Sequence, residues 1–192
     1  MTSSDENIRR VMEYAPDLKV CVGWDGNKDP MSIVDRAIAL GAYKVQLFKP
    51  YFNQESIDKA HANGILCNVF WADDPDEAQK YFEMGIDTVL TSGGAGNCTA
   101  GIETIGHLLA LRDEVNGPEV LIGAGVNAKV IAYFREHYPL CRSFHMSGKA
   151  DIPSAMVFRR EGVPMGIPGF DEWHIQQTSE EAVRLAKEAL HG

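Results

Sequence analysis

The chain has 192 residues and a formal net charge of −9, with 27 acidic side chains against 18 lysines and arginines. Hydrophobic residues make up 45% of the chain and charged residues 23%, an ordinary globular composition that excludes a disordered or fibrous protein. The negative charge disfavours nucleic acids and anionic membranes as partners, because both bind basic surfaces. A single small phosphate is still compatible with this charge, since a local group of backbone N–H groups can bind it.

The cysteines and the apolar segments indicate the compartment. Cys21, Cys67, Cys98 and Cys141 are widely spaced and form no CxxC pair, so we expect them to be reduced residues of the core. No apolar run approaches the ~20 residues of a membrane-spanning helix, and the amino terminus has no signal-peptide pattern. We therefore expect a soluble, cytoplasmic protein.

Short apolar runs alternate with amphipathic segments along the chain. The expected strands cover residues 18–24, 44–48, 65–71, 89–91, 120–122 and 143–146. The expected helices cover residues 6–14, 30–40, 53–63, 75–84, 99–115, 128–137 and 179–190, and several of them end at a glycine. Residues 151–171 are rich in Pro, Gly and Met, which predicts a loop or a short extended excursion, and 172–177 could form a last short strand.

This alternation predicts about six strand–helix units in one domain over residues 1–192. Short buried strands separated by helices form parallel sheets, because parallel strands need a crossover connection. No GxGxxG follows the first strand, so a parallel (βα)-barrel of the TIM-barrel type is favoured over a dinucleotide-binding sheet. A closed barrel of that type has eight strands and about 250 residues. We therefore expect a barrel that is incomplete, that closes with fewer strands, or that is completed by homo-oligomerisation.

Three glycine-containing motifs directly follow expected strands. They contain Ser92, Gly93 and Gly94, then Gly123 and Gly125, and then Ser147, Gly148 and Lys149. In parallel βα architectures ligands bind at this end of the strands. Glycine lets the backbone approach a ligand closely, and N–H groups and helix N-termini favour anions. The expected ligand is a small, phosphate-like anion; the alternative is that these glycines only form tight turns.

His145 is the best candidate in the chain for acid–base or metal chemistry, although a structural hydrogen-bonding role is equally open to it. Lys49 and Trp71, at the ends of earlier strands, and Arg159, in the tail, are further candidate ligand contacts. The histidines form no HxxxH or HExxH pattern, so no preformed metal site is expected.

The second half of the chain contains several motifs of one family in the family's order. Residues 87–94 read DTVLTSGG, 122–127 read IGAGVN and 144–149 read FHMSGK, followed by MVFR at 156–159 and VPMG at 163–166. From about residue 88 to 192 the chain resembles the C-terminal part of the CutC copper homeostasis family. This resemblance implies a βα-barrel with its glycine-rich half-site, and copper as a possible bound metal.

The first half carries a different resemblance. Residues 44–50 read KVQLFKP, 61–71 read HANGILCNVFW and 84–91 read MGIDTVLT. From about residue 7 to 91 the chain is similar to the C-terminal half of glycerophosphodiester phosphodiesterases, which are also βα-barrels. The chain thus looks like a chimera of segments 1–90 and 91–192, natural or engineered.

Three functions follow from these resemblances. The first is a CutC-like, copper homeostasis-type protein that binds a small anion or metal at its strand ends without complete catalytic machinery. The second is a metal-dependent hydrolase of the phosphodiesterase class, but that family's His-Arg-Gly and Glu-x-Asp motifs have no counterpart here. The third is a recombined barrel with no evolved activity. We expect the first, and we expect no enzyme activity.

Overall fold

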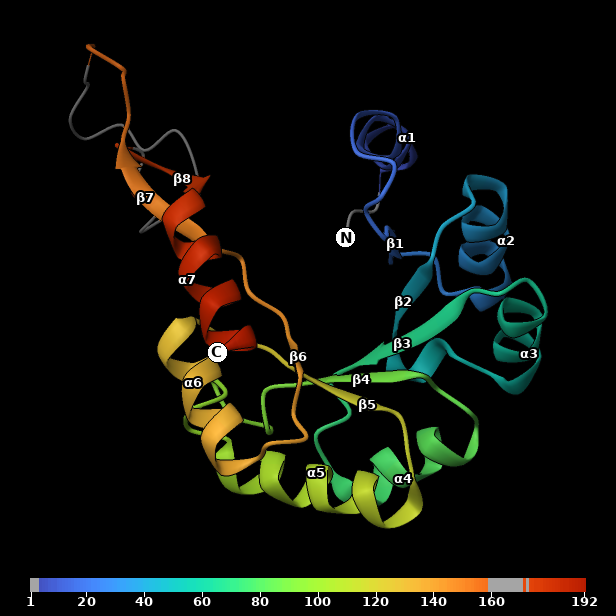
Figure 1. Cartoon of the computed structure of the whole chain (residues 1–192). Coiled ribbons are helices and arrows are strands. Elements are labelled where there is room, and N and C mark those ends of the chain that lie inside the picture. Colours follow the sequence, from blue (N-terminus) through green and yellow to red (C-terminus); the bar gives the residue numbers. More distant parts are fainter. Residues whose placement is uncertain (1–3, 159–170, 172) are drawn as a thin grey trace.

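Six parallel strands form one curved sheet, and helices alternate with them along the chain (Figure 1). The computed structural model describes residues 4–158, 171 and 173–192, without the side chains of Phe48 and Lys49. The strands are β1 (Cys21–Gly23), β2 (Lys44–Phe48), β3 (Leu66–Phe70), β4 (Thr88–Thr91), β5 (Glu119–Ile122) and β6 (Ser143–Phe144). Each pairs with the next one in the chain, so the sheet order equals the sequence order.

The helices are α1 (Asp5–Tyr14), α2 (Pro30–Leu40), the short 3-10 helix η1 (Lys49–Tyr51), α3 (Gln54–Ala62), α4 (Pro75–Glu83), α5 (Ile102–Val115), α6 (Ala128–His137) and α7 (Glu180–His191). Their boundaries have local causes. Asp29 and Asp74 accept N-terminal N–H groups and each precedes a proline at the first helical position. Gly41 adopts a left-handed conformation (φ 63°) that ends α2 and returns the chain to the sheet.

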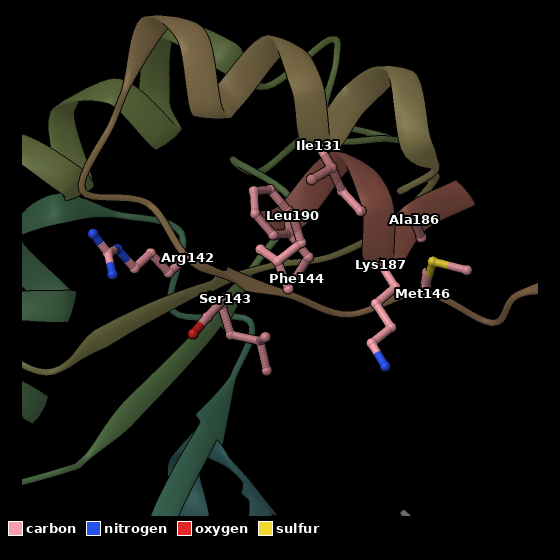
Figure 2. A pocket seen from close by; sticks show the side chains of 9 residues that line it. Ile131, Arg142, Ser143, Phe144, Met146, Ala186, Lys187 and Leu190 are labelled. Atoms are coloured by element: carbon pink, nitrogen blue, oxygen red, sulfur yellow. The ribbon is translucent and has the colours of Figure 1, made fainter. Parts of the chain in front are cut away.

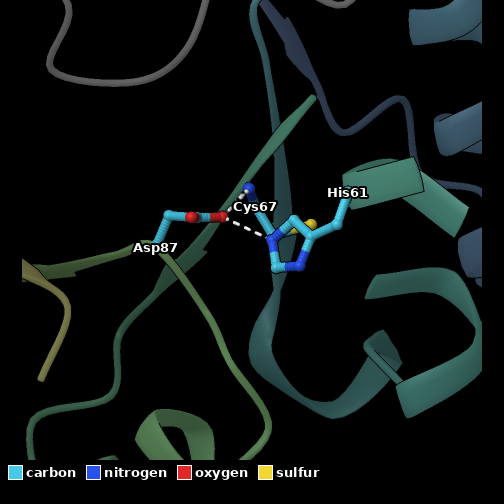
Figure 3. A group of neighbouring side chains, drawn as sticks. All are labelled: His61, Cys67 and Asp87. Carbon is cyan, nitrogen blue, oxygen red and sulfur yellow. Dashed lines mark hydrogen bonds and ion pairs between the residues drawn. The ribbon is translucent and has the colours of Figure 1, made fainter. Parts of the chain in front are cut away.

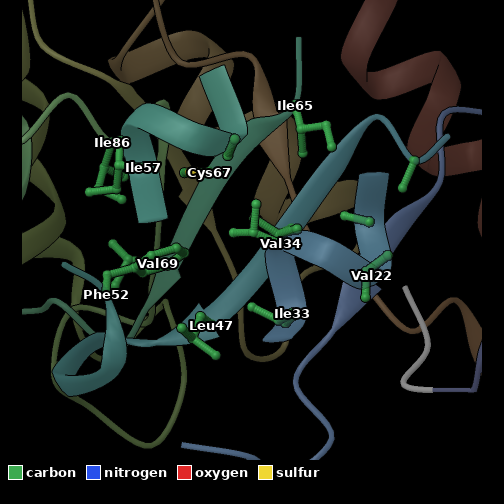
Figure 4. Packing of buried hydrophobic residues seen from close by; sticks show 14 of the residues in the cluster. Val22, Ile33, Val34, Leu47, Phe52, Ile57, Ile65, Cys67, Val69 and Ile86 are labelled. Atoms are coloured by element: carbon green, nitrogen blue, oxygen red, sulfur yellow. The ribbon is translucent and has the colours of Figure 1, made fainter. Parts of the chain in front are cut away.

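The main core lies between the outer face of the sheet and its covering helices (Figure 4). Val45, Leu47 and Val69 are fully buried there against side chains of α2 and α3. A second, smaller cluster lies under β5 and β6; it comprises Cys98, Ile105, Leu109, Val120, Ile122, Phe134 and Cys141. Both clusters follow from alternation along each strand, which turns every second side chain toward the helices.

The other face of the sheet is more polar. Asn68 Nδ2 donates a hydrogen bond of 2.6 Å to Gln46 Oε1 on the neighbouring strand, and both residues are buried. Lys44 Nζ donates to Thr88 Oγ1 at 2.8 Å across two strands. These bonds give Asn68 Nδ2 and Lys44 Nζ acceptors on the concave side of the sheet, whereas the buried Asn68 Oδ1 has no hydrogen-bond partner among the described residues.

The sheet is a curled half-barrel, which confirms the predicted parallel βα architecture with six units. Strands β1 and β6 form its two edges, and in the described part of the chain neither edge pairs with another strand on its outer side. The two segments that resemble different families share this one sheet, because β3 pairs with β4 in continuous register from Asn68↔Thr88 to Phe70↔Leu90.

The tail forms a hairpin that the sequence did not predict. Strands β7 (Lys149–Pro153) and β8 (His174–Thr178) pair antiparallel in a separate two-stranded sheet. The segment 151–171, expected as a loop or a short extended excursion, begins as a strand, because Asp151 and Ile152 pair with Gln176 and Ile175, and its residues 159–170 lie outside the described structure. The expected last strand is present as β8. Helix α7 follows it with Ser179 as N-cap, as predicted, and lies beside α6.

None of the helices in the described residues has the length and apolar character needed to cross a membrane.

Candidate ligand-binding cleft

A cleft of about 420 Å³ opens at the carboxyl ends of the strands. Its volume is in the range of sites for small molecules. Residues from the ends of β2 through β6 line it: Gln46, Phe70, Trp71, Leu90, Gly123, Ala124, Gly125, Val126, His145, Met146 and Ser147. Parallel strands place all these ends at one edge of the sheet, which is why residues distant in sequence meet there.

Two residues with strained backbones lie in the cleft lining, Trp71 directly after β3 and Ala124 in the loop after β5. Trp71 has φ 64° and Ala124 has φ 67°, and of the described residues other than glycine only Asn116 also has a positive φ. Bulky and Cβ-bearing residues avoid this conformation, and such strain is concentrated at functional sites. Trp71 N–H donates to Leu90 O at 3.0 Å, which holds the strained backbone against β4 and leaves the indole 41% exposed at the cleft.

The loop after β5 forms part of the cleft lining. Gly123 N–H continues the ladder to Thr91 O at 2.9 Å, and the chain then turns through the left-handed Ala124 and Gly125. Among the described residues, none accepts a hydrogen bond from the N–H of Gly125 or Val126. Asn127 ends the loop by capping α6, with its side chain accepting from Lys129 and Val130 N–H. The free donors are therefore the N–H groups of Gly125 and Val126 in the loop, whereas the N-terminus of α6 is capped by Asn127.

His145 is the one ionisable side chain among the described residues that line the cleft. Its N–H donates to Ile122 O at 2.8 Å, which fixes the residue beyond the end of β6. The side chain is accessible to solvent, yet desolvation by the surrounding protein lowers the pKa of His145 from its ordinary value of 6.5. At pH 7 the imidazole is therefore neutral and can both donate and accept a hydrogen bond.

Gly123 packs closely against Leu90 at the base of the cleft. A Cβ on this residue would lie 2.7 Å from Leu90 Cδ1 and 3.8 Å from His145 Cβ. The absence of a side chain here lets Leu90 pack under the loop and keeps the space in front of His145 open.

The structure places the predicted site residues in three groups. Trp71, Gly123, Gly125, His145 and Ser147 line the cleft together. Ser92, Gly93 and Gly94 follow β4, as expected, but are not among its lining residues. Ser92 N–H donates to Asp73 Oδ1 of the loop after β3 at 3.2 Å and Gly93 N–H donates to Thr91 Oγ1 at 2.9 Å, so both N–H groups already have partners in the protein.

The remaining predicted contacts lie elsewhere. Gly148 is buried next to the hairpin, and Lys149 lies in β7, where its Nζ donates to Gln176 Oε1. The chain leaves the sheet and enters the hairpin at Lys149, and the contact of this residue with a ligand stays a prediction. Lys49 lies in η1, and its side chain is outside the described structure, as is all of Arg159.

Sequence reasoning missed Gln46 and Met146. Gln46 is an inward-facing residue within β2, where period-two alternation alone would have placed it on the concave side.

Met146 also lines a second hollow of about 370 Å³ between β6 and α7, where Leu121, Ile131 and Leu190 make the lining mostly apolar (Figure 2). None of the predicted ligand contacts lines that hollow, so the cleft at the strand ends is the better candidate site.

Fold and cleft together define a parallel βα half-barrel with a candidate ligand site at the carboxyl ends of its strands. Comparison with known proteins relates this chain to the CutC family, whose family model matches residues 69–150. A CutC family protein of Chromobacterium violaceum is 36% identical over 121 residues, covering 62% of this chain and 47% of the relative. One of Vibrio cholerae is 30% identical over 139 residues, covering 70% and 54%. The chain thus spans about half the length of these relatives.

Solved structures show the same fold. The putative copper homeostasis protein CutC of Streptococcus agalactiae superposes with a TM-score of 0.56 at 19% identity, covering 73% of this chain and 80% of that one. A structure titled native KDPGal has a TM-score of 0.56 at 16% identity, covering 97% of this chain and 72% of that one.

The match corrects the expected boundary between the two resemblances. It begins at Val69 in β3, not at the Asp87–Thr88 turn, and it ends at Ala150. Residues 69–87, which we grouped with the phosphodiesterases, therefore fall within the CutC match. The phosphodiesterase resemblance of the preceding residues, and the chimeric origin inferred from it, stay predictions.

The cleft does not fit a copper ion. Its described lining offers one imidazole and one thioether from the adjacent residues His145 and Met146, with no cysteine. The cysteines are elsewhere, and burial raises the pKa of Cys21 and Cys141 to about 11, so these thiols stay protonated. In the described residues, the one cluster of three His, Cys, Asp or Glu ligand atoms is on β3, β4 and α3, away from the cleft.

Proposed function

We propose that this chain is a CutC-type binding protein that holds a small, phosphate-like anion in the cleft at its strand ends. The supporting observation is the loop from Ala124 to Val126, which lines the cleft in a strained conformation with the N–H groups of Gly125 and Val126 free. Free backbone N–H groups in a glycine-containing loop are a common way for proteins to bind anions. Ser147 and His145 add side-chain donors on the neighbouring strand end.

The same lining argues for binding without complete catalytic machinery. Acid–base catalysis commonly uses two titratable groups with separated pKa values, and the described cleft contains one, His145. The described lining of the cleft also contains no lysine or arginine, so neutral donors would hold the anion. Neutral donors suit a site that binds an anion with moderate affinity and releases it again.

Replacing His145 with glutamine is expected to weaken phosphate binding about tenfold, because a hydrogen bond to a charged group is lost or weakened. Isothermal titration with inorganic phosphate at constant ionic strength measures this loss. The matched control is His107→Gln, which changes a histidine on α5, outside the cleft, and should bind phosphate like the wild type. Wild-type protein without saturable phosphate binding, or equal affinity in both variants, would contradict the proposal.

The pH dependence of sulfate binding tests the same site, because the charge of sulfate is constant in the pH range in which histidine titrates. The pKa of His145 is lowered from 6.5, so protonation occurs below pH 6.5 and then adds a positive charge beside the anion. Sulfate affinity should therefore rise as the pH falls below 6.5 in the wild type and stay flat in His145→Gln. The folding stability of the ligand-free protein should change in the opposite direction. As the pH falls below 6.5, the unfolded state takes up the proton of His145 before the folded state does, so the free energy of unfolding decreases.

We also propose that the half-barrel forms a homodimer. The two edge strands β1 and β6 carry backbone groups that lack sheet partners in the described chain, and exposed edges of this kind favour pairing with another copy. Light scattering coupled to size exclusion should give twice the chain mass across the micromolar range. A monomer at every concentration would contradict the dimer and leave the cleft proposal intact.

A further inference from the structure

Three side chains of different chemistry converge at the end of the sheet opposite the cleft (Figure 3). His61 comes from the last turn of α3, Cys67 from the start of β3 and Asp87 from the residue before β4. One ligand atom from each lies within 4.8 Å of the other two. His61 Nε2 is 2.8 Å from Asp87 Oδ2, and the same oxygen accepts the Cys67 N–H at 2.8 Å.

We propose that His61, Cys67 and Asp87 form a binding site for a borderline divalent metal ion such as Zn²⁺. Imidazole nitrogen, thiolate sulfur and carboxylate oxygen are the three ligand types that Zn²⁺ takes in proteins, at about 2.0 to 2.3 Å. In a tetrahedral site, nitrogen and oxygen ligands are separated by roughly 3.3 Å. The observed 2.8 Å pair must therefore open by only about half an ångström when the metal replaces the proton between the two atoms.

The position of the cluster allows an ion to enter. The side chains of His61 and Asp87 are 37% and 27% exposed, whereas Cys67 is fully buried behind them. His61 is at the surface end of its helix and can adjust its ring without moving the sheet. The three residues leave a fourth coordination position for water or another ligand from solvent, as in open zinc sites.

The chemistry of the thiol is consistent with metal-dependent ionisation. Zn²⁺ binds cysteine as the thiolate, so the Cys67 thiol loses its proton when it becomes a ligand. Binding therefore forms a metal–sulfur bond and releases the thiol proton to solvent, with no change of oxidation state. The negative charge of the Asp87 carboxylate attracts the same cation.

This site is separate from the proposed anion site. Cys67 is near the start of β3 and Asp87 directly precedes β4. The cleft is at the carboxyl ends of the strands, where Phe70 and Trp71 line it. A bound ion would add a link between α3 and the paired strands β3 and β4, where the His61–Asp87 pair now connects α3 to the residue before β4. Binding of metal would therefore stabilise the native fold.

Titration of the reduced protein with Co²⁺, followed by Zn²⁺ competition, tests the proposal. We expect one equivalent per chain, the visible bands of tetrahedral Co²⁺ and a near-ultraviolet thiolate-to-cobalt band that Zn²⁺ abolishes. Cys67→Ser should abolish the thiolate band, and His61→Gln should weaken binding by about 100-fold or more. The matched controls Cys141→Ser and His107→Gln, which change a buried cysteine and a histidine elsewhere, should bind like the wild type.

Thermal unfolding with Zn²⁺ or with a chelator provides the second measurement. Zn²⁺ should raise the midpoint of the wild type and of both controls, and leave His61→Gln unchanged. Because His61 is exposed, that variant should fold even where Cys67→Ser does not. Absence of a thiolate band in the wild type, or a band that persists in Cys67→Ser or disappears in Cys141→Ser, would overturn the proposal.

Discussion

Alanine at Gly101 is expected to reduce the free energy of unfolding by about 3 kcal/mol, the upper end of the cost of overpacking. A Cβ on this residue would lie 2.1 Å from Ser92 O and 2.8 Å from Gly93 Cα. Both atoms belong to backbone, so no side-chain rotation can relieve the overlap. The loop after β4 would have to move as a unit, and Thr91 and Asp73, which are joined through Oγ1 and Oδ1 at 2.5 Å, would move with it.

Gly96→Ala is the matched control, because it lies in the same loop and a Cβ there meets no atom within 4 Å. Its unfolding free energy should stay within about 0.5 kcal/mol of the wild type. Urea unfolding followed by circular dichroism measures both variants. Equal stabilities for Gly101→Ala and Gly96→Ala would show that the Gly93–Gly101 contact is looser than the structure indicates.

Replacing Phe134 with alanine should cost about 3 to 5 kcal/mol, the range for a fully buried aromatic side chain. Phe134 is 1% exposed and is the largest residue of the small cluster under β5 and β6. Its ring lies 5.7 Å from that of Tyr138 and 6.3 Å from that of Phe144 on β6. The cluster contains few residues that could move to fill the cavity, so little of the cost would be recovered.

The neighbouring Tyr133 supplies the comparison for Phe134. It is 36% exposed and stacks on His137 with ring centroids 4.1 Å apart, so Tyr133→Ala should cost no more than about 1 kcal/mol. Unfolding by urea ranks the two variants. Since Phe144 directly precedes His145, Phe134→Ala should also weaken phosphate binding at 25 °C, whereas Tyr133→Ala should not. Similar losses of stability for the two would contradict the packing described for this cluster.

Much of the candidate cleft is predictable from the amino-acid sequence, for one physical reason. Strands that alternate with helices are parallel, and parallel strands bring their carboxyl ends to one edge. That is why Trp71, Gly123, Gly125, His145 and Ser147, which stand at or just after such ends, line one cleft.

The same reasoning cannot distinguish glycines that approach a ligand from glycines that approach the protein itself. Gly93 lies at the end of β4, where the pattern predicts a ligand loop, yet a Cβ on this residue would lie 2.2 Å from Gly101 O. Its lack of a side chain therefore serves the packing of the loop. The start of β7 at Lys149 could not be predicted for a related reason, since the point at which a chain leaves a sheet depends on tertiary pairing, here with β8.

By itself the sequence determined the class of architecture, because hydrophobic periodicity and glycine stops depend on neighbours a few residues apart. It also determined that the chain supplies six units, too few for a closed eight-stranded barrel. Only the tertiary structure decided which polar groups meet. His61, Cys67 and Asp87 are separated by up to 26 residues and share no spacing motif, and pairing of β3 with β4 brings them together. Whether a strand-end N–H is free or bonded was likewise decided by packing, because Ser92 N–H finds its partner Asp73 in the loop after β3, whereas the N–H groups of Gly125 and Val126 have no partner among the described residues.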